Sequence, residues 1–246
     1  MSERLSGSRG PEKGNQRLAE KVAELIEQDI WESGWNVGSV VGSESELMER
    51  YGVSRAVFRE AARLVEHQRM AAMRRGPGGG LVVTEPEPGV VRNAARVYLR
   101  HAGVDRRQLF EARMALELAM MTSASSNVTE PGIERLNEAL DAERQLLDRG
   151  VTRGHARNLH RVIAEVAGNP AVTLFVEVLA QLDQDMVQQK WDEKGPSGDA
   201  SDEAAQASHE AHRAIVAAIV SGDAALAQHR MRRHLQAITE LFEAEP

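Results

Sequence analysis

The chain has 246 residues, a formal net charge of −7, no cysteine, and 42% hydrophobic but only 4% aromatic residues. This length suffices for two ordinary domains, and a core of aliphatic residues favours packed helices. The lack of cysteine excludes a disulfide framework and a thiolate zinc site, and the negative charge argues against a protein that coats nucleic acid regardless of sequence. The sequence has no apolar run suited to a membrane span or a signal peptide, so we expect a cytoplasmic protein with no membrane partner.

The first part of the chain is predicted to be a tail followed by one helix. Polar residues dominate positions 1–14, which we expect to be disordered. Apolar residues then recur at helical spacing, at Leu18, Val22, Leu25, Ile26 and Ile30. This pattern predicts a helix over residues 15–31, with Trp31 and Trp35 closing the core beneath it. Residues 39–41, Ser-Val-Val, are predicted to form a short strand.

Two short helices joined by a tight turn are predicted next. Ser43 and Ser54 can each cap a helix, and Gly52 between them tolerates the positive φ that a sharp turn requires. Arg55 and Arg59 are four residues apart, so they share one face near the start of the second helix. Such a helix fits the DNA major groove, where guanidinium groups bind guanine or phosphate. The pattern therefore predicts a helix-turn-helix that binds double-stranded DNA.

A hairpin with a glycine-rich tip follows the second helix. Strands are predicted over residues 71–75 and 81–84, joined by Gly-Pro-Gly-Gly-Gly. Glycines such as Gly78 let the backbone approach a partner closely, and Arg74 and Arg75 indicate that the partner is anionic. Residues 50–75 hold seven arginines and two glutamates, so the local net charge is 7 − 2 = +5. A plain flexible turn with surface arginines is the alternative. A nucleotide-binding loop fits less well, because a strand rather than a helix follows.

A proline-rich segment separates these elements from the rest of the chain. We place a linker at residues 86–90, because prolines and a glycine interrupt any helix there. From residue 91 to residue 246 the apolar pattern is helical throughout. Helices are predicted over residues 89–101, 105–124, 130–149, 152–167, 170–190, 202–221 and 223–243. Short connections favour antiparallel neighbours, so the expected fold class is mainly α, with an all-α antiparallel helical bundle in the C-terminal part.

Three histidines in the later helices form a candidate metal site. Six of the eight histidines fall in this region as three pairs, and one member of each pair shares an apolar stripe of its helix: His160, His212 and His234. Three neutral imidazoles that converge from three helices would hold a divalent cation such as zinc. The alternative is that each is an ordinary hydrogen-bonded histidine of the core or the surface.

The helix-turn-helix residues resemble those of a known family. The arrangement Ser-Glu at 43–44, Gly-Val-Ser-Arg at 52–55, Arg-Glu-Ala at 59–61 and a glycine-rich wing resembles the winged helix-turn-helix of GntR-type bacterial transcription regulators. The resemblance covers residues 15–85. Members of the family usually carry Pro-Ser-Glu-Arg where this chain has Gly-Ser-Glu-Ser at 42–45. Ser45 therefore replaces an arginine that contacts DNA, and it keeps only a hydroxyl group with which to bind a phosphate.

The C-terminal part is similar to the all-helical effector domain, called FCD, of the FadR-like branch of that family. The similar segments are Phe-Glu-Ala-Arg at 110–113, Leu-His at 159–160, Glu-Ala-His-Arg-Ala-Ile at 210–215 and Arg-His-Leu at 233–235. In metal-binding members, three histidines and an acidic residue one helical turn before the first of them hold a metal that helps to bind a carboxylate. His160, His212 and His234 match these histidines. Ala156 stands at the acidic position, and the adjacent His155 is a candidate substitute.

The same resemblance implies an effector site and a mechanism. It assigns Arg113, Glu117 and Asn169 to effector binding, since a guanidinium fork can bind a carboxylate in a bidentate manner. The alternative for Arg113 and Glu117 is a solvated ion pair within one helix. The resemblance implies a homodimeric, ligand-responsive regulator, a repressor in most members, that binds a DNA operator and senses a small organic acid. The other hypotheses are a helical metalloenzyme with Glu165 or Glu210 as general base, and a constitutive DNA-binding dimer whose effector site has decayed.

Overall fold

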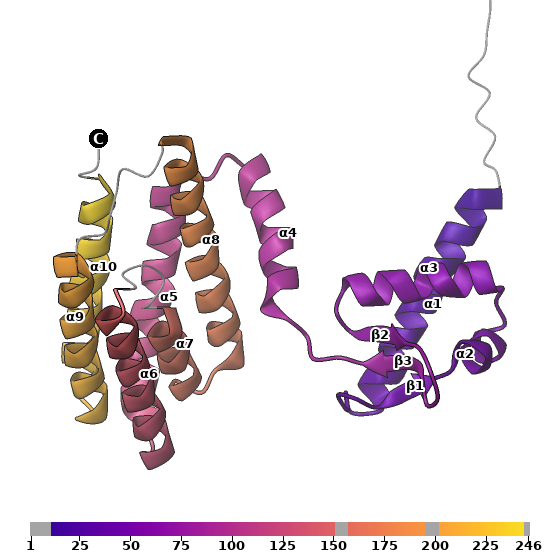
Figure 1. Cartoon of the computed structure of the whole chain (residues 1–246), viewed down its shortest axis with the longest axis horizontal. Helices are drawn as coiled ribbons and strands as arrows, with labels where there is room; N and C mark the ends of the chain where they lie inside the picture. Colours follow the sequence, from indigo (N-terminus) through magenta and orange to yellow (C-terminus); the bar gives the residue numbers. More distant parts are fainter. Residues whose placement is uncertain (1–10, 151–156, 195–201, 244–246) are drawn as a thin grey trace, which may run out of the picture. The chain divides into compact units, whose positions relative to one another are not determined.

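The computed structural model describes residues 11–150, 157–194 and 202–243 and is shown in Figure 1. The chain divides between Val90 and Val91 into two compact units, which we call the winged-helix unit and the helical unit. Residues 1–10 of the predicted tail and His155 and Ala156 lie outside the described residues. In the described ranges, no helix is both long enough and apolar enough to cross a membrane.

The winged-helix unit contains three helices and a small sheet. The helices are α1 (Pro11–Glu32), α2 (Glu44–Tyr51) and α3 (Arg55–His67), and the strands are β1 (Val40–Gly42), β2 (Ala71–Arg74) and β3 (Gly80–Val83). The strands form one antiparallel sheet in the order β1-β3-β2. This confirms the predicted winged helix-turn-helix. Helix α1 begins at Pro11 rather than at the predicted residue 15.

The predicted capping residues define where the helices of the helix-turn-helix begin and end. The Ser43 hydroxyl accepts a hydrogen bond from the backbone N–H of Glu46, whose carboxylate accepts one from the backbone N–H of Ser43 at 2.8 Å. Gly52 ends α2 in the left-handed region at φ 64°. Ser54 then caps α3 by accepting from the backbone N–H of Val57. The turn is therefore set by local signals that are readable in the sequence.

The core of this unit lies between α1, α2, α3 and the sheet. Its largest fully buried side chains are Ile26, Ile30, Leu47, Phe58 and Leu81. The prediction for Trp31 is wrong, because its side chain is 72% exposed. Trp35 does pack against the core, and its indole N–H donates to the carbonyl oxygen of Thr84 at 3.0 Å. The rings of Trp31 and Trp35 meet edge to face, with their centroids 5.9 Å apart.

Gly80, at the start of β3, lies too close to a neighbouring strand for any side chain. Its φ is +146°, and a Cβ at this position would lie 2.4 Å from the carbonyl oxygen of Gly42. We expect Gly80→Ala to lower the free energy of unfolding of the winged-helix unit by about 2–4 kcal/mol, because the backbone must shift or remain strained. Calorimetric melting of the full chain measures this loss. Gly89→Ala is the control, since a Cβ there meets nothing within 4 Å; equal melting temperatures for the two variants would contradict the prediction.

The helical unit is built from helices alone in its described part, which confirms the predicted all-α architecture. The helices are α4 (Pro88–His101), α5 (Arg106–Asn127), α6 (Glu130–Asp148), α7 (Arg157–Val166), α8 (Pro170–Lys194), α9 (Asp202–Val220) and α10 (Ala224–Glu243). Helix α5 packs against α7, α8, α9 and α10, so it is the central helix of the bundle (Figure 1). Because proline suits the first turn of a helix, the predicted linker at 86–90 is helical from Pro88 onward.

Apolar side chains from several helices fill the interior of the bundle. The largest are Met120, Met121, Leu136, Leu159, Ile163, Ile215 and Ile219, all fully buried. Amid this aliphatic core lie several buried charged or polar side chains, which is unusual because burying an unpaired charge is costly. These buried polar residues form the candidate site described below.

Candidate nucleic-acid interface and candidate metal centre

The start of α3 presents two arginines to solvent. Arg55 and Arg59 are both largely exposed, and both guanidinium groups contact the same carboxylate oxygen of Glu44, at 3.5 and 3.1 Å. Glu44 is the first residue of α2, so its carboxylate holds the side chains of Arg55 and Arg59 near the start of α2. Exposed ion pairs of this kind are worth little to stability. The arrangement therefore leaves both guanidinium groups able to exchange Glu44 for a phosphate or a base.

The two predicted serines have different surroundings. Ser45 is exposed in the first turn of α2, and its hydroxyl lies 3.2 Å from that of Ser43. Ser54 is also exposed, but its hydroxyl caps α3. Ser45 is thus an exposed residue within the helix-turn-helix whose hydroxyl contacts that of Ser43, whereas the first role of Ser54 is structural.

The basic charge of this unit is partly neutralised. Ion pairs join Arg50 to Asp29, Arg63 to Glu60 and Arg69 to Glu87, at 3.3, 3.1 and 3.9 Å. Glu60 is already included in the local charge of +5, whereas Asp29 and Glu87 lie outside residues 50–75 and reduce that charge further. The prediction from composition therefore overstates how much of the arginine charge is free to act on DNA.

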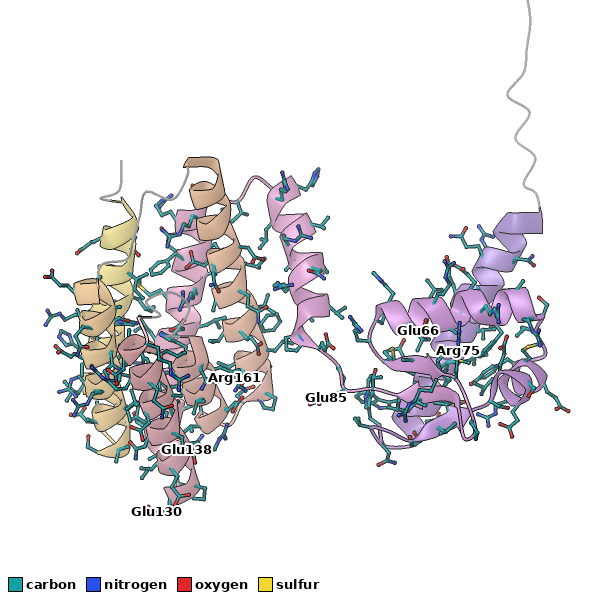
Figure 2. All side chains as sticks on the ribbon, viewed as in Figure 1. Glu66, Arg75, Glu85, Glu130, Glu138 and Arg161 are labelled. Atoms are coloured by element: carbon teal, nitrogen blue, oxygen red, sulfur yellow. The ribbon has the colours of Figure 1, made fainter. Side chains whose placement is uncertain are left out.

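The wing keeps its positive charge. Arg74 and Arg75 are exposed, and neither forms an ion pair with any described residue. Gly78 lies at the wing tip with a φ of +71°. Figure 2 labels Arg75 in the wing and Glu66 on α3, whose carboxylate accepts from the backbone N–H of Met73 at 2.8 Å. That hydrogen bond links β2 to α3, the helix that carries Arg55 and Arg59. It therefore helps to fix the position of the wing relative to α3 within this unit.

Three helices of the helical unit bring the predicted histidines together. His160 on α7, His212 on α9 and His234 on α10 are all buried. The Nε2 atom of His212 lies 3.3 Å from the Nε2 atom of His160 and 3.0 Å from that of His234. We call these residues the histidine cluster. Each offers one ring nitrogen within 4.8 Å of the others, which is the spacing of groups that can share a metal ion.

Two buried glutamates orient the histidine cluster from outside. Glu117 on α5 lies 2.5 Å from Nδ1 of His160, and both carboxylate oxygens of Glu143 on α6 lie 2.9 Å from Nδ1 of His212. His209, the partner of His212 in the sequence, also lies near Glu143, with its Nδ1 at 3.4 Å. A carboxylate accepts a hydrogen bond from the Nδ1–H group, which leaves the Nε2 lone pairs of His160 and His212 directed at the centre of the cluster.

A chain of buried charges continues from Glu117 toward α8. The Nε of Arg113 donates to Glu117 at 2.6 Å, and its Nη1 donates to Asp183 at 3.3 Å. Asp183 also accepts from the Nε of Arg106 at 2.9 Å. The two predicted effector residues on α5 therefore lie beside the histidine cluster. Asp183 and Glu143 were not predicted, because their partners lie on helices far away in the sequence.

The protonation of these groups follows from their partners. Burial alone would raise the pKa of Glu117, but the charges and hydrogen bonds of Arg113 and His160 outweigh burial and hold that pKa well below its ordinary value. Burial would lower the pKa of Arg113, yet Glu117 and Asp183 raise it. Burial, reinforced by His212 and His160, lowers the pKa of His234 well below the ordinary value. His234 is therefore neutral, the form that binds metal ions.

Asn169 does not join this group of residues. It is exposed before α8, and its side-chain oxygen accepts from the backbone N–H groups of Ala171 and Val172 at 3.1 and 3.4 Å. Within the described part of the chain, it has no recorded contact with Arg113 or the histidine cluster. The structure thus gives Asn169 a helix-capping role.

The glutamates considered as catalytic bases lie elsewhere. Glu165 forms ion pairs with Arg135 and with Arg161, which Figure 2 labels on α7. Glu210 is exposed and accepts from the side chain of Gln206 at 3.3 Å. A general base needs hydrogen-bond reach of the reacting group, and neither residue has a recorded contact with the histidine cluster among the described residues.

Comparison with known proteins matches both units. Residues 18–83 match the family described as bacterial regulatory proteins, gntR family, and residues 108–237 match the FCD domain. The chain is 27% identical to the Uxu operon regulator of Haemophilus influenzae over 143 residues, which are 56% of this chain and 50% of that protein. It is 27% identical to the HTH-type transcriptional repressor NanR of Cronobacter sakazakii over 219 residues, which are 82% of this chain and 76% of that protein.

A solved structure has the same fold. The GntR protein of Streptococcus agalactiae superposes with a TM-score of 0.66 and 21% identity, covering 90% of this chain and 99% of that one. The predicted GntR-type, FadR-like resemblance is confirmed, and the family is one of regulators rather than enzymes. The chain belongs to the gntR family of bacterial regulatory proteins and carries the FCD domain.

Proposed function

We propose that the protein is a homodimeric transcription repressor whose helical unit senses a small carboxylate through a divalent metal, zinc being the best fit. Family membership supports the DNA-binding part of this proposal, and the relative NanR is named a repressor. The observation that carries the sensing part is the histidine cluster, in which three buried imidazoles converge and two buried glutamates orient them.

The dimensions of the cluster fit zinc. Zinc binds histidine nitrogen at about 2.0–2.1 Å, so a tetrahedral ion would separate two ligand nitrogens by about 3.3–3.4 Å. The Nε2 separations of 3.3 and 3.0 Å are close to this value. Three neutral nitrogens would bring no charge to the ion itself and would leave one or more coordination positions open. A bound ion would thus supply a positive centre that attracts a carboxylate oxygen.

Arg113 is the second group available to the carboxylate. Its contact with Asp183 at 3.3 Å is longer than its contact with Glu117 at 2.6 Å, so the Asp183 contact is the easier of the two to exchange. A carboxylate near the histidine cluster would compete with Asp183 for that Nη1 group. Because Asp183 on α8 also binds Arg106, this exchange would change how α5 and α8 are held together.

The response to the effector would act through linkage. An effector that binds two conformations of the dimer unequally shifts their populations, and only one spacing of the two α3 helices fits half-sites about one DNA turn apart. Arg55 and Arg59 would enter the major groove, and Arg74, Arg75 and Gly78 of the wing would lie against the backbone. Ser45 would add one phosphate contact.

Substitution of Arg55 or Arg59 tests the proposal that α3 binds DNA. We expect Arg55→Ala and Arg59→Ala each to weaken binding to a selected operator fragment by about 1–3 kcal/mol, because each removes a guanidinium contact to a base or phosphate. Fluorescence anisotropy with DNA selected from a random pool by the wild-type protein measures this. Arg107→Ala is the control, as it removes a similarly exposed arginine from α5. Unchanged operator affinity in both reading-helix variants would refute the docking of α3.

A further inference from the structure

A cavity of the helical unit lies apart from the histidine cluster. It has a volume of about 640 Å³ and is bounded by α4, the start of α5 and α8. None of the three clustered histidines lines it. Its size falls within the range of small-molecule sites, which is about 300–1,000 Å³.

One wall of this cavity is basic. Arg92, Arg96 and Arg100 line it and are spaced by four residues along α4, so they share one helix face. The Nη1 of Arg92 donates to Gln181 at 3.2 Å, while its Nε is fully buried with no hydrogen-bond partner. No ion pair with a described residue is recorded for any of the three. Buried donors are nearly always satisfied by a protein group, a ligand or a water molecule, so this Nε is available to an acceptor.

The rest of the lining is largely apolar. Leu109 of α5 and Leu182 of α8 line it and belong to a small apolar core that the two helices share, while Leu99 comes from α4 itself. Two carboxylates also line the cavity. Asp105 is engaged as the cap of α5, where it accepts from the backbone N–H of Gln108 at 2.8 Å, and Asp185 is exposed. The lining charge is therefore 3 − 2 = +1, with the arginines concentrated on one side.

We propose that this cavity binds an organic carboxylate with an apolar body. The guanidinium groups of Arg92, Arg96 and Arg100 hold the carboxylate by charge-assisted hydrogen bonds, and the leucines contact the apolar part. Inorganic phosphate has no apolar part to contact the leucines, and an apolar cation would be repelled by the arginines. This site uses no residue of the histidine cluster, so it does not depend on the proposed metal or effector there.

Calorimetric titration of the full chain with decanoate tests the proposal. We expect decanoate to bind at least about tenfold more tightly than inorganic phosphate or decyltrimethylammonium. Phosphate lacks an apolar chain, and decyltrimethylammonium lacks a carboxylate. The double variant Arg96→Gln, Arg100→Gln should weaken decanoate binding by about tenfold or more, because it removes two charged donors. Asp185→Asn should tighten binding about two- to threefold, since it removes a repelling charge without removing any donor. Arg107→Gln, outside the cavity, should leave the affinity unchanged.

Several results would overturn this assignment. They are no decanoate binding by the wild-type chain, equal affinity in the wild-type and double-variant proteins, and equal loss in Arg107→Gln. Binding that survives the double variant but disappears in His212→Ala would place decanoate at the histidine cluster, which refutes the second site and leaves the proposed function standing. Thermal melting confirms that each variant is folded, and the opposite effect of Asp185→Asn is a readout that does not depend on the double variant.

Discussion

Replacing Glu117 with alanine is expected to lower the free energy of unfolding of the helical unit by about 3–5 kcal/mol, the usual cost of breaking a buried ion pair. Glu117 is fully buried, and it is the shared partner of Arg113 and of Nδ1 of His160. Its removal leaves Arg113 with Asp183 alone and His160 without its acceptor. Urea unfolding at pH 7, followed by far-ultraviolet circular dichroism, measures the loss.

A second carboxylate on the same helix provides the control. Glu111 pairs with Arg107 at 2.7 Å, but both side chains are largely exposed. We expect Glu111→Ala to change stability by less than about 1 kcal/mol, since exposed pairs contribute little. Equal losses for Glu111→Ala and Glu117→Ala would mean that burial of the Arg113–Glu117 pair has no energetic consequence.

The pH dependence of the Glu117 contribution has a definite sign. Arg113 and His160 hold the pKa of the folded-state carboxyl below its unfolded value, despite burial. The contribution is therefore present above the unfolded pKa and is lost as the pH falls toward the folded pKa. The stability difference between the wild-type protein and Glu117→Ala should accordingly shrink in acid, which unfolding at pH 3 and pH 7 will measure.

Zinc is expected to stabilise the wild-type chain and not the His212→Ala variant. Because a ligand that binds only the folded state adds RT ln(1 + [L]/Kd), free zinc at a hundred times its Kd would contribute about 2.7 kcal/mol. His212 is the central member of the cluster, since its Nε2 is near those of both His160 and His234. Its loss would leave two imidazoles, too few for a stable zinc site.

Differential scanning fluorimetry with zinc or with a chelator measures this difference in each protein. His212→Ala will be less stable for other reasons, because Glu143 loses a partner, so the readout is the zinc-dependent change alone. His229→Ala is the matched control, as His229 is an exposed histidine of α10. An equal zinc-dependent shift in His212→Ala and the wild-type protein would place any zinc site elsewhere.

The helix-turn-helix could be predicted because its signals are local. Ser43, Gly52 and Ser54 act on neighbouring backbone groups, so their roles are readable within a few residues of sequence. The choice of His160, His212 and His234 rested on helical periodicity, which identifies the face that points inward. These predictions needed no knowledge of how helices pack against one another.

The residues that sequence reasoning missed depend on tertiary packing. Glu143 meets His212 across 69 residues of sequence, and Asp183 meets Arg113 across 70. Helical spacing can at most indicate that such a carboxylate faces the interior. It does not indicate which side chain the carboxylate will contact. The error at Trp31 has a different origin. Trp31 directly follows the buried Ile30, so helical spacing alone turns its side chain about 100° away from the buried stripe of α1.

Operator affinity, measured with and without zinc and a panel of small carboxylates, tests the central claim most directly. The account predicts that zinc together with at least one carboxylate changes the affinity of the wild-type protein for its selected operator by at least about fivefold, the lower limit of typical allosteric coupling. The same additions should leave His212→Ala unaffected. The account would be contradicted if wild-type affinity stayed the same under every condition, because the protein would then bind DNA without control by its helical unit.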